Sequence, residues 1–501
     1  MLLGIDIGTS SVKALLFDAD TAAVVATASC EYPTHHPRPD RAEQHPDDWW
    51  RAAISAVREA LAAAGRADVA AIGLCGQMHG VSLLDGNGTP VHPSIIWADQ
   101  RSAAESGALI TAVGVDRFTR IAGTLPAAGF MASTLAWLRK HDPQTLHRAR
   151  HVLLPKDYVR LKLTGEIGTD VSDAAATGLF DIVNRTWSET LVDAVGAPPE
   201  LFPTAYDSAA LTGALIPSAA EALGLRVGIP VVAGCADQPA QALGNGLIAP
   251  GKASVTIGSG GQVFTPIQPD SEGTLKTDPR LHVINHAVPG MYYILGAILS
   301  AGLSLRWLRG VTGLEGRAAY DLMSAEAARV APGADGLIFL PYLSGERTPH
   351  MDPLARGGFI GLTHYHERGH LARAIMEGVA FAMRDALSIS LELGGQVEMV
   401  IAAGGGAESD VWRQILADVF GVPLRKSLLS ELTGVGAALL AGVGSGVYDS
   451  LDSACAQTAR YGAPIEPDAE RQATYDALYA QYQALYPRLR DSFHWLSRFG
   501  G

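Results

Sequence analysis

Apolar positions at the start of the chain follow the pattern of buried β-strands. Leu2 to Ile7 is apolar except for Asp6, a polar turn runs from Gly8 to Ser11, and Val12 to Phe17 is again mostly apolar. This predicts a hairpin with a carboxylate in a buried strand, which is costly unless the charge is paired or bound to a metal. Such a turn can direct backbone N–H groups at a polyanion while the carboxylate holds a hydrated cation. An ordinary hairpin with a satisfied aspartate is the alternative, and this stretch alone does not separate the two.

The same pattern returns near the middle of the chain. Ala253 to Ile257 is apolar, Gly258 to Gly261 is a turn of small residues, and Gln262 to Pro266 leads away from it. Strand, small-residue turn, strand at matched places indicates an internal duplication with a boundary near Gly246–Gly251. We therefore predict two domains, residues 1–246 and 247–501, as the length of the chain also suggests.

Between these hairpins, helical periodicity alternates with short apolar runs, which predicts an α/β fold. A helix over 49–64 is expected to be capped by Asp47 or Asp48 and to end at Gly65. Strands are expected over 69–74, 229–234 and 397–403, and helices over 371–392 and 411–420. The last helix, about 468–485, is predicted to stop before Pro487 and to pack back across the domains through its apolar face.

Composition narrows the possible partners and the compartment. The formal net charge of −13 argues against nucleic acid and anionic membranes as partners. The chain has no basic leader and no apolar run of membrane-spanning length. Its 4 cysteines (Cys30, Cys75, Cys235, Cys455) are scattered, which favours a reducing compartment over a disulfide or zinc framework. We expect a cytoplasmic protein.

The sequence lacks the two common phosphate-binding loops, the P-loop and the dinucleotide-binding loop. The chain contains no GxxxxGK[ST], and no GxGxxG follows a strand in the right unit. The two small-residue turns could instead hold the phosphates of a nucleotide between the domains. Gly404, Gly405 and Gly406 stand between a strand and a helix, where they would let a flat base approach the backbone. A flexible connecting loop is the other interpretation.

Polar residues at predicted strand ends are candidates for chemistry. Asp237 follows an apolar strand and lies at or near the start of a helix, whose N-terminus favours the ionised carboxylate. It could accept a proton from an attacking hydroxyl or simply cap the helix, and position alone leaves these equal. Other polar or adaptable groups suited to a polyol are Gln77, Met78, His79 and Asp99. His79 could equally be a core histidine, and Lys156 with Asp157 reads as a structural ion pair or cap.

Several motifs along the chain carry a resemblance to a known family. They are Asp6-Ile7-Gly8-Thr9, Gln77-Met78-His79-Gly80, Pro155-Lys156-Asp157-Tyr158, Ser172-Asp173-Ala174-Ala175, the run from Leu340 to His350 (LPYLSGERTPH), Gly404-Gly405-Gly406, and the signature from Gly357 to Glu377. Taken together, these motifs resemble the FGGY carbohydrate kinases from the first strand to about Gly442. The resemblance implies two ribonuclease-H-like, actin-like ATPase domains, with ATP and Mg²⁺ in the interdomain cleft.

By this resemblance, Asp237 is the general base and Asp6 orients Mg²⁺ through water. The sugar is expected to contact Gln77, Met78, His79, Asp99, Asp237 and Gln238. The nucleotide is expected to contact Gly8, Thr9, Ser10, Lys13, Gly258, Ser259, Gly404, Gly405, Gly406 and Ser409.

The resemblance implies ATP-dependent phosphorylation of a ketopentose, with D-xylulose as the expected sugar. Three departures from the family pattern are Gln238 and Ala98, where asparagine is common, and Thr134, where lysine is expected. The first two lie near the expected sugar site, so ribulose or a pentitol remains an alternative substrate. A non-catalytic, nucleotide-switched protein on the same scaffold is a further alternative. A sugar and ATP are the expected partners, and a homodimer is compatible with this interpretation.

Overall fold

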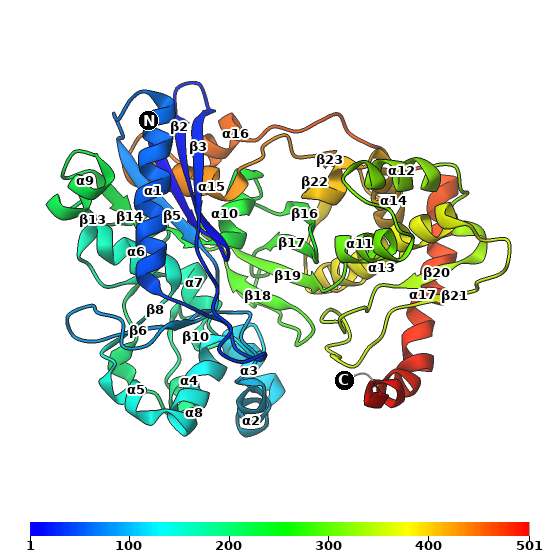
Figure 1. Ribbon diagram of the computed structural model, residues 1–501, viewed down its shortest axis with the longest axis horizontal. Coiled ribbons are helices and arrows are strands. Elements are labelled where there is room, and N and C mark those ends of the chain that lie inside the picture. The colour runs from blue at the N-terminus through cyan, green and yellow to red at the C-terminus, as the bar shows by residue number, and fades with distance from the viewer. Residues whose placement is uncertain (500–501) are drawn as a thin grey trace.

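The computed structural model, which describes residues 1–499, has two lobes, each built on a mixed β-sheet (Figure 1). The first sheet has the order β13-β14-β5-β1-β2-β3, with β15 also paired to β5. Its strands are β1 (Leu2–Ile7), β2 (Ser11–Asp18), β3 (Ala23–Glu31), β5 (Ala71–Gly76), β13 (Leu211–Ala214), β14 (Pro230–Val232) and β15 (Cys235–Ala236).

The second sheet has the order β18-β19-β17-β16-β22-β23 and repeats the core of the first. In each, a hairpin (β1–β2, β16–β17) is joined by a parallel strand, β5 beside β1 and β22 beside β16. This shared topology supports the predicted duplication. The strands of the second sheet are β16 (Gly251–Ile257), β17 (Gly261–Ile267), β18 (His282–Asn285), β19 (Tyr292–Ile298), β22 (Val397–Ala403) and β23 (Leu424–Lys426).

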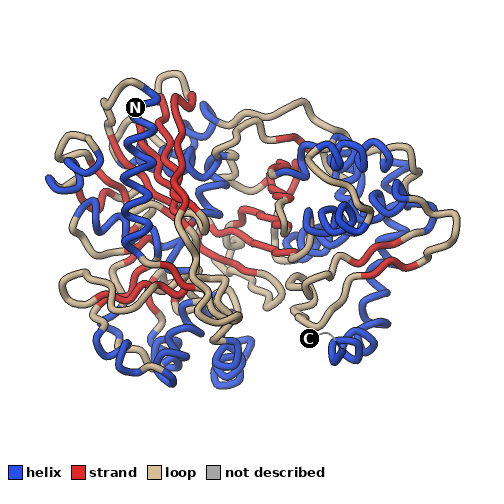
Figure 2. The backbone as a smooth tube through the Cα atoms, viewed as in Figure 1, coloured by secondary structure: helices blue, strands red, loops and turns tan. Residues whose placement is uncertain are grey.

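Helices and short strand pairs surround the two sheets (Figure 2). The short pairs are β4 (Glu43–Gln44) with β7 (Ser94–Ile95), β6 (Ser82–Leu84) with β8 (His151–Leu153), β9 (Thr169–Asp170) with β12 (Ala205–Tyr206), β10 (Phe180–Asp181) with β11 (Thr186–Trp187), and β20 (Ile338–Leu340) with β21 (Gly358–Ile360). The helices are α1 (Pro46–Ala64), α2 (Ala103–Val113), α3 (Val115–Ala122), α4 (Met131–His141), α5 (Pro143–Arg148), α6 (Pro155–Thr164), α7 (Val171–Ala175), α8 (Glu189–Val195), α9 (Pro217–Leu223), α10 (Asp237–Gly244), α11 (Gly302–Val311), α12 (Ala318–Ala327), α13 (Arg368–Glu392), α14 (Asp410–Phe420), α15 (Leu432–Gly444), α16 (Leu451–Thr458) and α17 (Ala469–Leu496). No helix among the described residues is long and apolar enough to cross a membrane.

The strand period of two divides β1 between two cores. Leu3, Ile5 and Ile7 face the core that α1 covers, whereas Leu2 belongs to the core formed with α15. Gly4 lies on the α15 side as well, because a Cβ there would meet the Gly434 carbonyl of α15. The α15 helix, drawn in orange in Figure 1, therefore packs on the first sheet although it lies in the second half of the sequence.

Two expectations about helix ends are wrong. Neither Asp47 nor Asp48 caps α1: His45 is the N-cap residue, and Pro46 opens the helix, where its missing N–H costs nothing. The last helix, α17, does not stop before Pro487, which lies inside it. A proline removes a single backbone donor, and the buried Tyr475, Tyr479 and Tyr482 hold this helix against its neighbours.

The expected packing of the last helix across the domains is also wrong. The neighbours of α17 are α13, α14 and β20, all in the second half of the chain. Its Tyr475 hydroxyl donates to Glu377 of α13 at 2.8 Å, and its Tyr479 hydroxyl donates to Asp385 at 2.6 Å. In Figure 1 the helix, in red, lies at the far side of the second lobe. The helix that does reach the first sheet is α15.

Candidate active site

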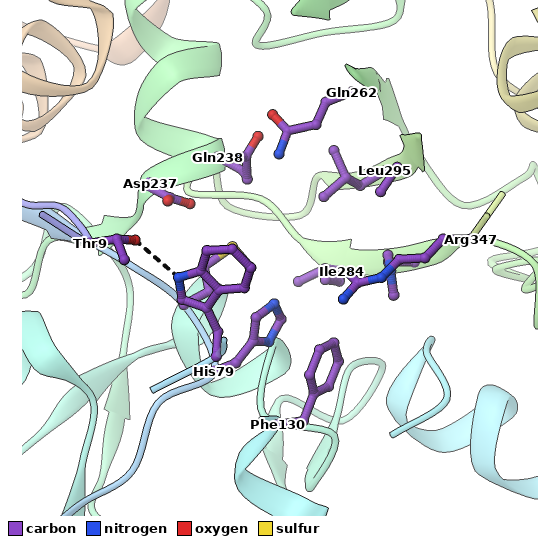
Figure 3. A pocket seen from close by; sticks show the side chains of 13 residues that line it. Thr9, His79, Phe130, Asp237, Gln238, Gln262, Ile284, Leu295 and Arg347 are labelled. Carbon is purple, nitrogen blue, oxygen red and sulfur yellow. Dashed lines mark hydrogen bonds between the residues drawn. The ribbon is translucent and has the colours of Figure 1, made fainter. Parts of the chain in front are cut away.

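A cavity of about 170 Å³ lies between the two halves, and both contribute to its walls (Figure 3). Met78, His79, Asp237 and Gln238, all predicted to contact a sugar, are among its lining residues. The first half supplies Thr9, Met78, His79, Trp97, Phe130, Asp237 and Gln238, and the second half supplies Gln262, His282, Ile284, Leu295, Ala297 and Arg347.

Asp237 is the first residue of α10, directly after β15. The N-cap residue is Ala236, so Asp237 does not act as the helix cap. Its Oδ1 is buried and has no hydrogen-bond partner within residues 1–499. Burial, together with the negative charge of Asp6, raises its pKa from 3.8 to about 7. Asp237 is thus a carboxylate with a free oxygen that can accept a proton near neutral pH.

Asp6 lies on the same side of β1 as Leu2 and Gly4, facing the N-terminus of α15. Its Oδ2 accepts a hydrogen bond of 2.7 Å from the Thr433 hydroxyl. Its Oδ1 is buried and finds no partner in the described part of the chain. Burial raises the pKa of Asp6, while Thr433 and Lys13 oppose that rise. Asp6 and Asp237 therefore each leave one oxygen available to a ligand.

Surrounding side chains hold the Gly8–Ser11 turn in place. The Gly8 carbonyl accepts from the Tyr32 hydroxyl and, at 3.4 Å, from the Gln77 amide. The Trp97 indole donates to the Thr9 hydroxyl at 3.0 Å, the dashed contact in Figure 3. The turn therefore presents Thr9 to the cavity.

A second cavity, of about 460 Å³, lies within the second half, beside the turn between β16 and β17. Its walls include the predicted residues Gly258, Ser259, Gly405, Gly406 and Ser409. The other lining residues are Ile257, Gly302, Leu305, Arg306, Arg317, Tyr320, Asp321, Ser324, Met376, Glu408 and Trp412. This cavity, with small residues in its wall, is the candidate site for the nucleotide expected at Gly258 and Gly405.

Gly404 has a different role from the two glycines after it. It is absent from the walls of the second cavity, but its φ of +83° is unfavourable for other residues. A Cβ there would lie 2.7 Å from the Ile257 carbonyl oxygen. Gly404 thus turns the chain from β22 into the loop, and Gly405 and Gly406 form the surface.

Gln77 and Asp99, which were also expected to contact a sugar, do not line the cavity between the halves. Both carboxylate oxygens of Asp99 are bound, by the Arg101 guanidinium and, at 2.7 Å, by the backbone N–H of Ala42. The Gln77 amide donates to Gln44 at 2.9 Å as well as to Gly8. Both residues are buried supports for loops near the site.

Ser10 and Lys13 also line neither cavity. Ser10 is exposed at the tip of the turn. The Lys13 ammonium pairs with Glu431 at 3.1 Å. Lys13 reaches the site only through its charge, which lowers the pKa of Asp6.

A buried ionic cluster supports the strand before Asp237. The Lys156 ammonium contacts Asp157 at 2.6 Å, Asp170 at 3.0 Å and Asp173 at 3.2 Å, all without exposed surface. This confirms the structural interpretation of Lys156 and Asp157. Ser172 accepts a 3.0 Å hydrogen bond from the Ala236 backbone N–H. The cluster therefore fixes the backbone immediately before Asp237.

Sequence reasoning missed several residues of the site. Phe130 stacks on the His79 ring at a centroid distance of 3.8 Å, and its centroid lies 6.1 Å from that of the His282 ring. Burial lowers the pKa of His79 to about 4 and that of His282 to about 3, so both rings are neutral. Arg347 stood within the quoted LPYLSGERTPH run without being singled out. Thr433 gave no sequence signal, because 427 positions separate it from Asp6.

Known proteins resemble the chain over its whole length. A xylulose kinase from Escherichia coli (strain K12) is 38% identical over 495 residues, covering 98% of this chain and 99% of that protein. A gluconokinase from Bacillus subtilis is 31% identical, covering 94% and 93%. The crystal structure of a xylulose kinase from Rhodospirillum rubrum superposes with a TM-score of 0.91 at 34% identity, covering 98% and 99%.

The sequence also matches two family models in tandem. The N-terminal domain of the FGGY family of carbohydrate kinases matches residues 1–244, and the C-terminal domain matches residues 253–445. These segments contain the two duplicated sheets and both cavities' lining residues. The chain therefore belongs to the FGGY family of carbohydrate kinases, as a sugar phosphotransferase of the xylulose-kinase-like group.

Proposed function

We propose that this protein transfers the γ-phosphoryl group of ATP to the C5 hydroxyl of D-xylulose, giving D-xylulose 5-phosphate and ADP. Full-length relatives named xylulose kinase support the choice of sugar. The observation that carries the proposal is the buried Oδ1 of Asp237, which has no partner among the described residues and borders a cavity lined by both halves.

In this proposal Asp237 is the general base. Its Oδ1 takes the proton of the C5 hydroxyl as that oxygen bonds to phosphorus and ADP leaves. A pKa of about 7 suits this role, because such a base is substantially ionised near neutral pH yet accepts a proton readily. Walls from both halves keep water away from the reacting atoms, which limits wasteful ATP hydrolysis. Gln238, beside Asp237, would position the sugar.

The cavity beside Gly258 and Ser259 would hold the nucleotide, with the base against Gly405 and Gly406. The phosphates would extend from Ser259 towards the Thr9 turn. The Oδ1 of Asp6, which lacks a partner in residues 1–499, fits a hydrated Mg²⁺ ion, which prefers carboxylate and water ligands. Asp6 would hold the ion through water. Bound Mg²⁺ would neutralise phosphate charge during transfer.

A sugar panel in a coupled ADP-release assay tests the proposal. D-xylulose, D-ribulose, xylitol and D-arabitol are compared at saturating MgATP, with EDTA as a control. The proposal expects D-xylulose to give the highest kcat/KM and EDTA to abolish turnover. A higher kcat/KM for ribulose or a pentitol would reassign the substrate.

Other outcomes address the remaining alternatives. ATP binding without sugar-stimulated ADP release would indicate a nucleotide-switched protein instead of an enzyme. The homodimer and the cytoplasmic location remain predictions, which sedimentation velocity and cell fractionation test.

A further inference from the structure

Arg347 places a positive charge in the sugar cavity from the second half of the chain. It lies between β20 and β21, and its side chain reaches the cavity wall. In the described part of the chain, no carboxylate lies within ion-pair distance of its guanidinium. The neighbouring Glu346 forms no ion pair with it, and its Oε1 instead accepts from the backbone N–H groups of Leu299 at 3.1 Å and Arg347 at 2.8 Å. The guanidinium donors are therefore available to a ligand.

The backbone that carries Arg347 is held firmly. The Thr348 N–H donates to the Ala297 carbonyl at 3.1 Å, and the Ala297 N–H donates to the Thr348 hydroxyl at 3.3 Å. Ala297 belongs to β19, so these bonds tie the loop to the second sheet. Less conformational freedom has to be lost when such a side chain binds a ligand.

Asp237 and Arg347 approach the cavity from opposite sides (Figure 3). Burial and the charge of Arg347 lower the pKa of the two cavity histidines, His79 and His282, so both rings are neutral. The cavity therefore has a carboxylate at one end and a guanidinium at the other. A guanidinium offers only hydrogen-bond donors, so it binds an accepting oxygen, and a carbonyl oxygen meets this need without a proton that requires another acceptor.

The chemistry of a 2-ketopentose matches this arrangement. The furanose ring of such a sugar closes through its C5 hydroxyl, so a ketose that offers a free C5 hydroxyl is in the open-chain form with a free C2 carbonyl. We propose that Arg347 donates a hydrogen bond to this C2 carbonyl oxygen while the C5 hydroxyl faces Asp237, and so selects open-chain ketoses over alditols. The inference rests on the proposed function and adds the residue that determines substrate class.

In this arrangement both halves of the chain bind the same sugar molecule. Asp237 lies in the first half and Arg347 in the second, and both line one cavity. An open-chain ketose would contact both halves, Arg347 through its C2 carbonyl oxygen and Asp237 through its C5 hydroxyl. The C2 hydroxyl of an alditol can also accept from the guanidinium, but its own proton must then find a separate acceptor, so an alditol should bind the second half less well.

The test compares kcat/KM for D-xylulose and xylitol in wild type, Arg347→Met and Arg347→Lys. Loss of a charge-assisted hydrogen bond predicts a fall of about 10- to 100-fold for D-xylulose in Arg347→Met. We expect less than about a threefold change for xylitol, because the transition state for xylitol makes little use of that donor. Arg347→Lys keeps the charge without the planar fork and should give an intermediate ratio. Arg356→Met is the matched control, since Arg356 contacts only nearby carbonyls and lines neither cavity.

The ratio of kcat/KM for D-xylulose to kcat/KM for xylitol decides the inference. Tm and ATP affinity are measured for the same variants. A collapse of the ratio in Arg347→Met with unchanged ATP affinity supports it. A ratio within about threefold of wild type, or an equal collapse in Arg356→Met, overturns it. If Arg347→Met does not fold, an unchanged ratio in Arg347→Lys overturns it as well. Wild type inactive on every sugar would instead refute the proposed function.

Discussion

Replacing Asp237 with asparagine should abolish most activity and yet stabilise the ligand-free protein at alkaline pH. Asparagine keeps the shape of the side chain but neither ionises nor accepts a proton as a base. Loss of a general base lowers kcat by about 10²- to 10⁴-fold. The stability gain follows from the pKa of Asp237, because a raised pKa means that folding disfavours the ionised carboxylate.

The size and sign of this effect can be worked out from the pKa. Below pH 3.8 the carboxyl group is protonated in both the folded and unfolded states, so it costs nothing. As the pH rises from 3.8 to about 7, the unfolded state ionises first and the folded state loses stability. Above about pH 7 the cost is constant. At about 1.4 kcal/mol per pKa unit, a shift of about three units corresponds to about 4 kcal/mol.

Thermal unfolding of wild type and Asp237→Asn between pH 4 and 8.5, without ligands, measures this difference. We expect the Tm of the variant to exceed that of wild type at pH 8 and the two values to converge near pH 4. Asp68→Asn is the control, because Asp68 is exposed and its pKa is lowered by Arg66. A Tm difference that does not change with pH would refute the electrostatic reasoning. More than about a tenth of wild-type activity in Asp237→Asn would remove Asp237 from its role.

Three further substitutions test contacts of β1 with α15 and the proline within α17. Thr433→Val removes the hydroxyl that binds Asp6, so kcat should fall about tenfold or more and the Mg²⁺ concentration for half-maximal activity should rise. Gly4→Ala places a Cβ 2.1 Å from the Gly434 carbonyl oxygen, and a lower Tm by calorimetry, worth about 1–3 kcal/mol or more, is expected. Pro487→Ala restores a helical N–H at an exposed position of α17 and should raise stability by up to about 3 kcal/mol in chemical denaturation. An unchanged kcat for Thr433→Val, an unchanged Tm for Gly4→Ala or an unchanged free energy of unfolding for Pro487→Ala would contradict the corresponding prediction.

Local patterns predicted the elements that hold the site. Apolar runs that end in small-residue turns, first at Gly8 and again at Gly258, identified both hairpins, because such runs are encoded locally. The position of Asp237 after an apolar run placed it at the first turn of α10. Glycines at 405 and 406 marked the second cavity, since their small size is what the wall requires.

Contacts between distant segments could not be predicted in the same way. Asp99 looked like a sugar ligand because it is polar and follows a strand, but the nearby Arg101 occupies its carboxylate. Nothing local distinguishes Arg347 from a surface arginine until the fold brings it opposite Asp237. The continuation of α17 through Pro487 likewise depends on tyrosines that pack against α13, and helix-breaking rules do not include such contacts.

The position of α15 means that neither half of this protein is a separable module. Residues 432–444 come late in the chain, yet they complete the core around Leu2, Leu15 and Phe17. A fragment ending at residue 246 would leave that apolar face bare and Asp6 without its Thr433 partner. Truncation or domain-swapping experiments that cut the chain between the two sheets would therefore yield insoluble pieces, unless a fragment carrying α15 is supplied together with the first.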